Sequence, residues 1–354
     1  MKNKILVILF IIIIFGLGFF SIILKDREVS SFERRKLTTF PNLDENFTNN
    51  LEDYLLDQFP FRNKLINLKS IINRKVLNNL ENNNVYVLDD NIFEKNYPLD
   101  EEKTLKFAQK INSIIENKED KSNIYYSIIP DKSYFLDGEK YLKLDYDKMY
   151  ETVQNNLNAN YIDITRGLVL EDYYKTDIHW KQENIEKIAK QILNRLGKDY
   201  EEKEYIEKSY NEFYGASYSK AGLDLKPDTL KYLYNEEFEN IEVTHLEYGK
   251  KDIYDEAKLT NVDSYDVFLS GASSFIEIKN NNLKDDSSII IFRDSIASSL
   301  IPLLIPYYNE VIVVDLRYID YSIVKDKIDL QNSDILFLYS TLIINSSDIL
   351  KVNK

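Results

Sequence analysis

The longest apolar run of the chain lies at its beginning. Ile5 to Leu24 is a stretch of 20 residues without a charged side chain, and it leads into the charged stretch "KDRE". A helix rises about 1.5 Å per residue, so this run matches the roughly 30 Å hydrocarbon core of a bilayer. A cleaved signal peptide usually has a shorter apolar region that ends in small residues. We therefore predict a transmembrane anchor over residues 1–25, with Lys2 and Lys4 holding the short N-terminus in the cytoplasm and the rest of the chain outside the cell membrane.

Residues 26–84 have the pattern of a polar stalk followed by a helix that Pro60 interrupts. The next stretch, "NNVYVLDDNIFEK", alternates apolar and polar residues around a turn and predicts a short hairpin. We take residues 26–84 as a stalk and helical connector, and residues 85–354 as the main domain.

Strand and helix patterns alternate through the main domain. Apolar runs such as "NIYYSIIP", "YIDI", "YDVFL", "SSIIIF", "EVIVVDL" and "DILFLYS" predict strands, and stretches with apolar residues at helical spacing lie between several of them, as in 101–117 and 185–196. This order predicts an α/β fold in which helices cover both faces of a parallel sheet. Residues 198–262 are charged and rich in turns, and we expect them to form an insertion over the sheet.

Composition excludes several classes of function. The chain has 354 residues, 44% of them hydrophobic, which is enough for a substantial core. Its 59 acidic residues against 45 basic ones give a net charge of −14, which would repel nucleic acid. Cysteine is absent, so disulfides, thiolate metal sites and cysteine nucleophiles are excluded.

One candidate for chemistry follows an apolar strand in "SSIIIFRDSIASSLIPLL". Ser295 stands where this strand passes into a helix, and open α/β sheets bind their ligands at the carboxyl ends of parallel strands. A serine there has an exposed hydroxyl next to helix-start N–H groups that can hold an oxyanion. The alternative is that Asp294 and Ser295 only cap the helix.

The second candidate is the stretch "TDIHW", which contains one of only two histidines. Histidine is the side chain best suited to moving protons near neutral pH. The structural alternative is that Asp177 caps a helix, His179 lies at the surface and Trp180 belongs to the core. A metal site with Asp177 and His179 is the least favoured interpretation, because the other histidine, His245, lies in the charged insertion.

The two stretches together predict a catalytic triad. A serine nucleophile needs a histidine base, and the base needs a carboxylate that fixes its tautomer. If both loops face the same edge of the sheet, Ser295, His179 and Asp177 meet in the chain order Asp, His, Ser. The rival serines do not directly follow an apolar strand and open a helix; they are Ser219, Ser273 and Ser298.

The chain resembles the DHHW family of anchored extracytoplasmic proteins, which are similar to the SGNH-like domains of alginate O-acetyltransferases. The stretches that carry the resemblance are "DQFPFRNKL", "YYKTDIHW", "FYGASYSKAG", "FRDSIASSLIPLL" and "VIVVDLRY". The resemblance implies an SGNH-hydrolase-like fold with permuted motif order. The first histidine of the family block is Ile178 here, whereas Asp177, His179 and Trp180 remain.

The same resemblance points to an oxyanion site. SGNH enzymes add a glycine N–H and an asparagine side chain to the N–H of the serine, and here Gly271 can offer the backbone donor while the asparagine is missing. Arg293 and Arg317 are expected near the same sheet end, where they either bind substrate oxygen or form structural ion pairs. Trp180 and Tyr218 are candidates for a platform that stacks on a sugar ring, although such aromatic residues more often belong to the core.

The expected function is therefore an anchored O-acyltransferase that modifies an extracellular glycan through the Ser295, His179 and Asp177 triad without a cofactor. If water replaces the sugar hydroxyl, the same site is an esterase. A different class is a non-catalytic glycan-binding or scaffold protein of an exopolysaccharide modification system. The resemblance also implies a membrane-embedded acyltransferase as the partner that delivers the acyl group.

Overall fold

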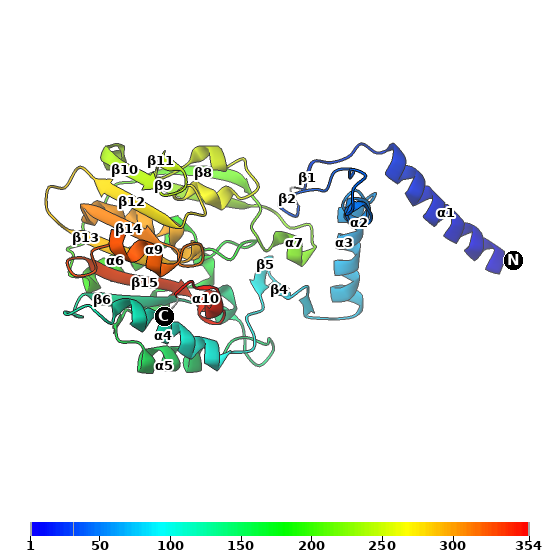
Figure 1. The fold of residues 1–354 in the computed structure, drawn as a ribbon. Coiled ribbons are helices and arrows are strands. Elements are labelled where there is room, and N and C mark those ends of the chain that lie inside the picture. Colours follow the sequence, from blue (N-terminus) through cyan, green and yellow to red (C-terminus); the bar gives the residue numbers. More distant parts are fainter. Residues whose placement is uncertain (1, 31, 353–354) are drawn as a thin grey trace. The chain divides into compact units, whose positions relative to one another are not determined.

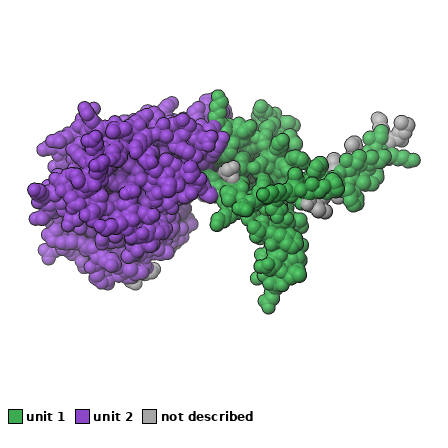
Figure 2. Space-filling model, turned by 90° about the horizontal axis from the view of Figure 1, so that it is seen from above, with its two compact units in different colours: residues 1–83, 218–226 green, residues 84–217, 227–354 purple. Residues whose placement is uncertain are grey.

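The computed structural model describes residues 2–30 and 32–352. The chain divides into two compact units, residues 1–83 with 218–226 and residues 84–217 with 227–354 (Figure 2). The predicted transmembrane stretch and the connector lie in the first unit, and the strands of the predicted sheet lie in the second. Each unit is described by itself below.

The first unit begins with the apolar helix α1 (Lys2–Ile23). Within the described residues, α1 is the one helix long and apolar enough to cross a membrane, over the window Lys4–Ser21. The break expected at Pro60 is confirmed, because α2 ends and α3 begins on either side of it. The elements after α1 are β1 (Val29–Ser30), β2 (Arg35–Lys36), α2 (Phe47–Asp57), α3 (Arg62–Ile71) with a π-helical turn Ile72–Val76, β3 (Glu81–Asn82) and α7 (Tyr218–Ala221).

The second unit opens with the predicted hairpin, formed by β4 (Val85–Leu88) and β5 (Asn91–Glu94). Asp89 and Asp90 connect the two strands, with φ angles of 48° and 64°. Two consecutive residues with positive φ are typical of the tight turn that fits the twist of a hairpin.

The core of the second unit is an eight-stranded sheet in the order β11-β10-β12-β14-β13-β15-β6-β7 (Figure 1). Strands β14, β13, β15, β6 and β7 run parallel, and β12, β10 and β11 continue the sheet in antiparallel pairing. The bounds are β6 (Ile124–Ile129), β7 (Asn160–Tyr161), β10 (Ile241–His245), β11 (Gly249–Lys251), β12 (Phe275–Asn280), β13 (Ser288–Arg293), β14 (Glu310–Val314) and β15 (Asp334–Ser340). The predicted α/β class with a mostly parallel sheet is confirmed.

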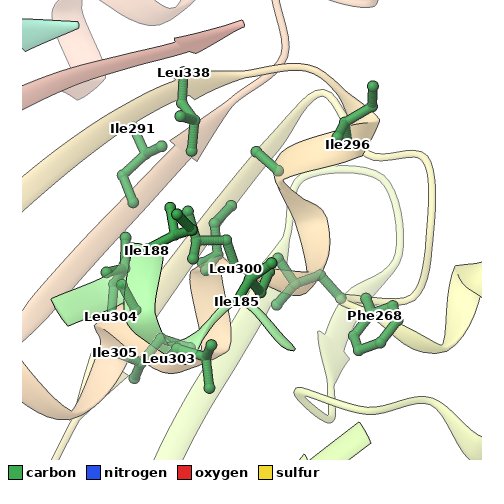
Figure 3. Packing of buried hydrophobic residues seen from close by; sticks show 14 of the residues in the cluster. Ile185, Ile188, Phe268, Ile291, Ile296, Leu300, Leu303, Leu304, Ile305 and Leu338 are labelled. Atoms are coloured by element: carbon green, nitrogen blue, oxygen red, sulfur yellow. The ribbon is translucent and has the colours of Figure 1, made fainter. Parts of the chain in front are cut away.

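Helices cover both faces of this sheet because its central strands are apolar on both sides. On β13, Ile289 and Ile291 pack with the hydrophobic cluster of α6 (Glu186–Arg195) and α8 (Ile301–Leu304), part of which Figure 3 shows. The alternate residues Ile290 and Phe292 pack with α4 (Glu101–Ile115) and α5 (Tyr146–Asn156). The short helices α9 (Tyr321–Val324) and α10 (Thr341–Ile344) also contribute to this second cluster.

The segment 198–262 contributes two different structures. Strands β8 (Ile206–Phe213) and β9 (Asp228–Tyr234) form a separate two-stranded sheet, whereas β10 and β11 extend the edge of the main sheet. The prediction of a strand at "YDVFL" was wrong. Asp263 caps a 3₁₀ turn over Ser264–Val267 there, and the strand that enters the sheet is β12, which follows it.

Candidate active site

Ser295 lies directly after β13, at the carboxyl end of the parallel part of the sheet. Asp294 caps the 3₁₀ turn Ser295–Ser299 by accepting a hydrogen bond from the Ile296 N–H at 2.9 Å, and its other oxygen accepts from the Ser340 N–H at 2.7 Å. Asp294, and not Ser295, is therefore the residue that caps this turn. Ser295 is half-buried, and its hydroxyl makes no hydrogen bond within residues 2–30 and 32–352, so it is available for chemistry.

Asp177 and His179 form a buried pair. The Nδ1 atom of His179 contacts Oδ1 of Asp177, which also accepts the His179 backbone N–H at 2.9 Å. The second carboxylate oxygen, Oδ2, accepts the Ala216 N–H at 2.6 Å. The aspartate does not cap α6, which begins only at Glu186. A carboxylate held in this way keeps the proton of the imidazole on Nδ1 and leaves Nε2 as the proton acceptor.

The Nε2 atom of His179 is buried and has no hydrogen-bond partner among the described residues. The imidazole lies flat against the ring of Tyr265, with ring centroids 3.8 Å apart and planes 13° apart. The Tyr265 hydroxyl reaches the turn that begins at Ser295, with Ser299 Oγ at 2.9 Å and the Ile296 carbonyl at 3.2 Å. The histidine is thus fixed to the serine turn through a side chain that the sequence did not single out.

A second link joins the two loops directly. The side-chain amide of Gln182 donates to the Ser299 carbonyl at 2.8 Å, across 117 residues of sequence. Gln182 is fully buried, so this bond is shielded from competing water. The two motifs that the sequence analysis joined therefore lie side by side.

His179 and Ser295 line one cavity of about 170 Å³. Three further site candidates from the sequence, Gly271, Arg293 and Arg317, line the same cavity. Asp177 lies behind His179 rather than in the wall. Tyr265, Phe268, Tyr318, Ser298, Ala272, Asp263 and Asp266 complete the lining.

Two predicted platform residues do not fit that role. Trp180 is fully buried and belongs to the core beside α6, so it presents no face to a sugar. Tyr218 lies in the first unit, where it is buried and packs edge-on against Phe32 with centroids 5.4 Å apart. Both are core residues, which is the alternative that the sequence left open.

Gly271 has a different role from the one expected. Its N–H donates to the Phe268 carbonyl at 3.1 Å and is not free to hold an oxyanion. The residue has a φ of +84°, and a Cβ there would come within 2.4 Å of the Asp266 carboxyl group. Glycine is therefore required for the tight turn that closes the cavity.

Arg293 and Arg317 share the buried carboxylate of Asp315. Arg317 binds it with two hydrogen bonds, from Nε at 2.9 Å and from Nη2 at 2.7 Å, which raise the pKa of Arg317 against the effect of burial. Arg293 makes one longer contact, from Nη1 at 3.2 Å. The ion-pair alternative is therefore correct for Arg317, and only in part for Arg293.

Lys132 supports the loop that carries Asp177. Its buried ammonium donates to the carbonyls of Tyr174 at 2.7 Å, Lys175 at 2.8 Å and Asp177 at 3.3 Å. Burial lowers the pKa of Lys132 to about 7, against the attraction of nearby carboxylates. It follows the carboxyl end of β6, which is the signal in the sequence that could have identified it.

His245, the other histidine, lies on β10 and is 2% exposed. Burial lowers its pKa to about 4, so it is neutral at pH 7. In the described ranges 2–30 and 32–352, no three His, Cys, Asp or Glu side chains are arranged to hold a metal ion.

The comparisons with known proteins agree with the fold described above. A DHHW family protein from Eubacterium siraeum has a similar structure at 19% sequence identity, with a TM-score of 0.63 over 77% of this chain and 98% of its own. Bacillus cereus PatB1 with a sulfonyl adduct is similar at 17% identity, with a TM-score of 0.58 over 73% and 97%. The O-acetyltransferase domain of Pseudomonas putida AlgJ aligns at 11% identity, with a TM-score of 0.43 over 74% and 92%. A search of curated proteins finds no match.

The structural similarities establish the fold. The family follows from the sequence, because the model of the DHHW family, described as DHHW protein, matches residues 72–314, which is more than half of the chain. The chain belongs to the DHHW family.

Proposed function

We propose that this protein is a membrane-anchored O-acyltransferase in which Ser295 is the nucleophile, His179 the general base and Asp177 the residue that orients His179. The observation that carries the proposal is the unpartnered, buried Nε2 of His179, on a side chain that lines the same cavity as Ser295. Activation of a serine requires a histidine whose Nδ1 is held by a carboxylate and whose Nε2 is free to accept the proton.

The reaction proceeds in two halves. Ser295 Oγ forms a bond to the carbonyl carbon of an acyl donor while its proton moves to Nε2 of His179, and the carbonyl electron pair becomes an oxyanion. Collapse of this intermediate breaks the bond to the leaving oxygen, which takes the proton from His179. An acceptor hydroxyl then attacks the acyl-serine with His179 again as the base, and Ser295 regains its proton.

The acceptor that we propose is a hydroxyl of an extracellular glycan, with acetyl as the acyl group. The support is membership of the DHHW family, together with the resemblance of that family to alginate O-acetyltransferases on which the sequence-based expectation rests. With water as the acceptor, the same residues act as an esterase. The chemistry up to the acyl-serine is identical in both cases, so it is tested independently of the acceptor.

In this proposal α1 spans the membrane and the second unit lies outside the cell. Acyl donors are made in the cytoplasm, so an extracellular transferase needs a membrane-embedded acyltransferase that passes the acyl group outward. Residues 2–23 supply the anchor that keeps this protein beside such a partner.

A serine-directed fluorophosphonate tests the nucleophile on the full chain in detergent. The wild type is expected to be labelled at Ser295, Ser295→Ala to remain unlabelled and His179→Ala to be labelled far more slowly. Ser298→Ala is the matched control, because Ser298 lines the same cavity but has no assigned role, so its loss should leave labelling intact. Labelling that survives Ser295→Ala would refute the assignment, and a wild type that is never labelled would favour a non-catalytic glycan-binding protein.

A further inference from the structure

Arg293 is a buried cation with unused hydrogen-bond donors. Its side chain is 1% exposed and lies at the end of β13, two residues before Ser295. Its Nε and Nη2 atoms have no partner among the described residues, although both are buried. An unsatisfied buried donor is costly, and more so when it is charged, so two on one side chain call for an acceptor.

Asp315 does not supply that acceptor. Its carboxylate is already held by the two hydrogen bonds from Arg317 and by the Arg317 backbone N–H at 3.1 Å. Arg293 reaches only one of its oxygens, at 3.2 Å. A purely structural ion pair is expected to be bidentate, with two N–H groups of the guanidinium donating to one carboxylate. Arg317 binds Asp315 in this way, whereas Arg293 does not.

The cavity that Arg293 lines offers a place for such an acceptor. A volume of about 170 Å³ is many times the roughly 10–15 Å³ that one water needs in a cavity, so there is room for a short acyl group. The cavity wall carries Asp263 and Asp266, and Asp315 lies behind the two arginines. Because these carboxylates offset Arg293 and Arg317, the site is poorly suited to a ligand with a permanent negative charge.

We propose that the free N–H groups of Arg293 bind the carbonyl oxygen of the acyl group and stabilise the oxyanion that forms when Ser295 attacks. This role rests on the proposed function. It deepens that function by naming the donor that replaces the asparagine of SGNH enzymes. It also replaces the Gly271 N–H, which the Phe268 carbonyl occupies. A buried charged donor acts most strongly on charge that develops in the transition state.

The experiment measures turnover of 4-nitrophenyl acetate and binding of methylboronic acid by the full chain in detergent. The boronate adds to a serine hydroxyl and becomes a tetrahedral anion, so its affinity reports on oxyanion stabilisation. Trp180 is the single tryptophan and lies next to His179, which makes its fluorescence a binding signal. Arg293→Met is expected to lower kcat by about 10²–10³ while KM changes little, and to weaken the boronate in parallel. Arg293→Lys, which keeps one charged donor, should recover part of both losses and covers the case in which Arg293→Met does not fold.

Lys118→Met is the matched control. Lys118 is also a buried cation of the second unit, but it donates to the carbonyls of Leu330 and Gln331, away from the cavity residues. Its loss should lower thermal stability and leave kcat and boronate affinity intact.

The outcomes separate this inference from the function on which it rests. If the wild type turns over the ester and Arg293→Met changes only stability, Arg293 is structural and the inference is overturned while the triad stands. If the wild type neither turns over the ester nor reacts with the fluorophosphonate, the proposed function fails and the oxyanion role fails with it.

Discussion

His179 and Tyr265 lie face to face, with ring centroids 3.8 Å apart, and the Tyr265 hydroxyl is bonded to the turn that begins at Ser295. One side chain therefore sets the position of His179 relative to the turn that begins at Ser295. The two loops are far apart in sequence, and contacts that take no part in proton transfer fix their relative positions.

This arrangement predicts different effects for two substitutions of Tyr265. Tyr265→Leu removes the stacked ring, and we expect kcat for a short ester to fall by up to about 10²-fold, because a small misplacement of a reacting group has effects of that size. Tyr265→Phe keeps the ring and loses only the hydroxyl, so its main effect should be a loss of about 1 kcal/mol in the free energy of unfolding. Steady-state kinetics and denaturant titration separate the two, and equal kcat values for both variants would show that the stack does not position His179.

The close packing of Gly215 against Asp177 provides a steric test of the position of that aspartate. A Cβ at this position would lie 2.3 Å from the Asp177 Cβ and 2.5 Å from the Thr176 carbonyl oxygen. Gly215→Ala must therefore push the turn that holds Asp177, and we expect lower stability and a loss of turnover. Gly138→Ala is the control, because its Cβ would meet only the flexible end of Lys143 at 3.2 Å. Turnover that survives Gly215→Ala unchanged would mean that the position of Asp177 is not critical.

His245 predicts a pH dependence of stability. Burial lowers its pKa from the ordinary 6.5 to about 4, with Glu247 and Asp255 opposing the shift and Arg293 and Lys251 adding to it. Between these two pH values the unfolded chain binds more protons than the folded one, so the free energy of unfolding falls as the pH drops from about 6.5 to 4. The loss amounts to up to about 3 kcal/mol. Denaturant titrations of wild type and His245→Phe at pH 7 and pH 4 measure it, since the variant should lose less on acidification. The same loss in both proteins would contradict this origin.

The absence of cysteine gives a direct test of the anchor. A single cysteine at Lys284, which is exposed on the second unit, should react with a membrane-impermeant maleimide in intact cells. A single cysteine at Lys4, which precedes the apolar core of α1, should react only after lysis. Release of the Lys284→Cys protein into the medium would identify α1 as a cleaved signal, and labelling of Lys4→Cys in intact cells would reverse the orientation.

Much of the fold could be predicted because its signals are local. The stripe of Ile185, Ile188 and Ile192 predicted α6, and the unbroken apolar run of β13 predicted a strand that is buried on both faces. The error at "YDVFL" arose because side-chain capping by Asp263 outweighs β propensity there. The pairing of β10 with β12 depends on contacts between distant segments, which no local pattern reports.

For the candidate site, the sequence offered only two signals, which are the type of a residue and its position at the end of a predicted strand. His179 stands out because the chain has only two histidines, and Ser295 because it directly follows an apolar strand. The free donors of Arg293 could not be foreseen, since they depend on how Arg317 occupies Asp315. Trp180 was misplaced for a similar reason, because it packs into the core beside α6 while its neighbour His179 lines the cavity, and no local pattern reports this difference.

The most direct test of the triad is to trap the acyl-serine. The full chain is incubated with 4-nitrophenyl acetate, quenched in acid and mapped by mass spectrometry. We expect one acetyl group on the peptide that contains Ser295 in the wild type, and none in Ser295→Ala or, within the same time, in His179→Ala. An acetyl group on another residue, or on the Ser295 peptide at the same rate without His179, would contradict the account.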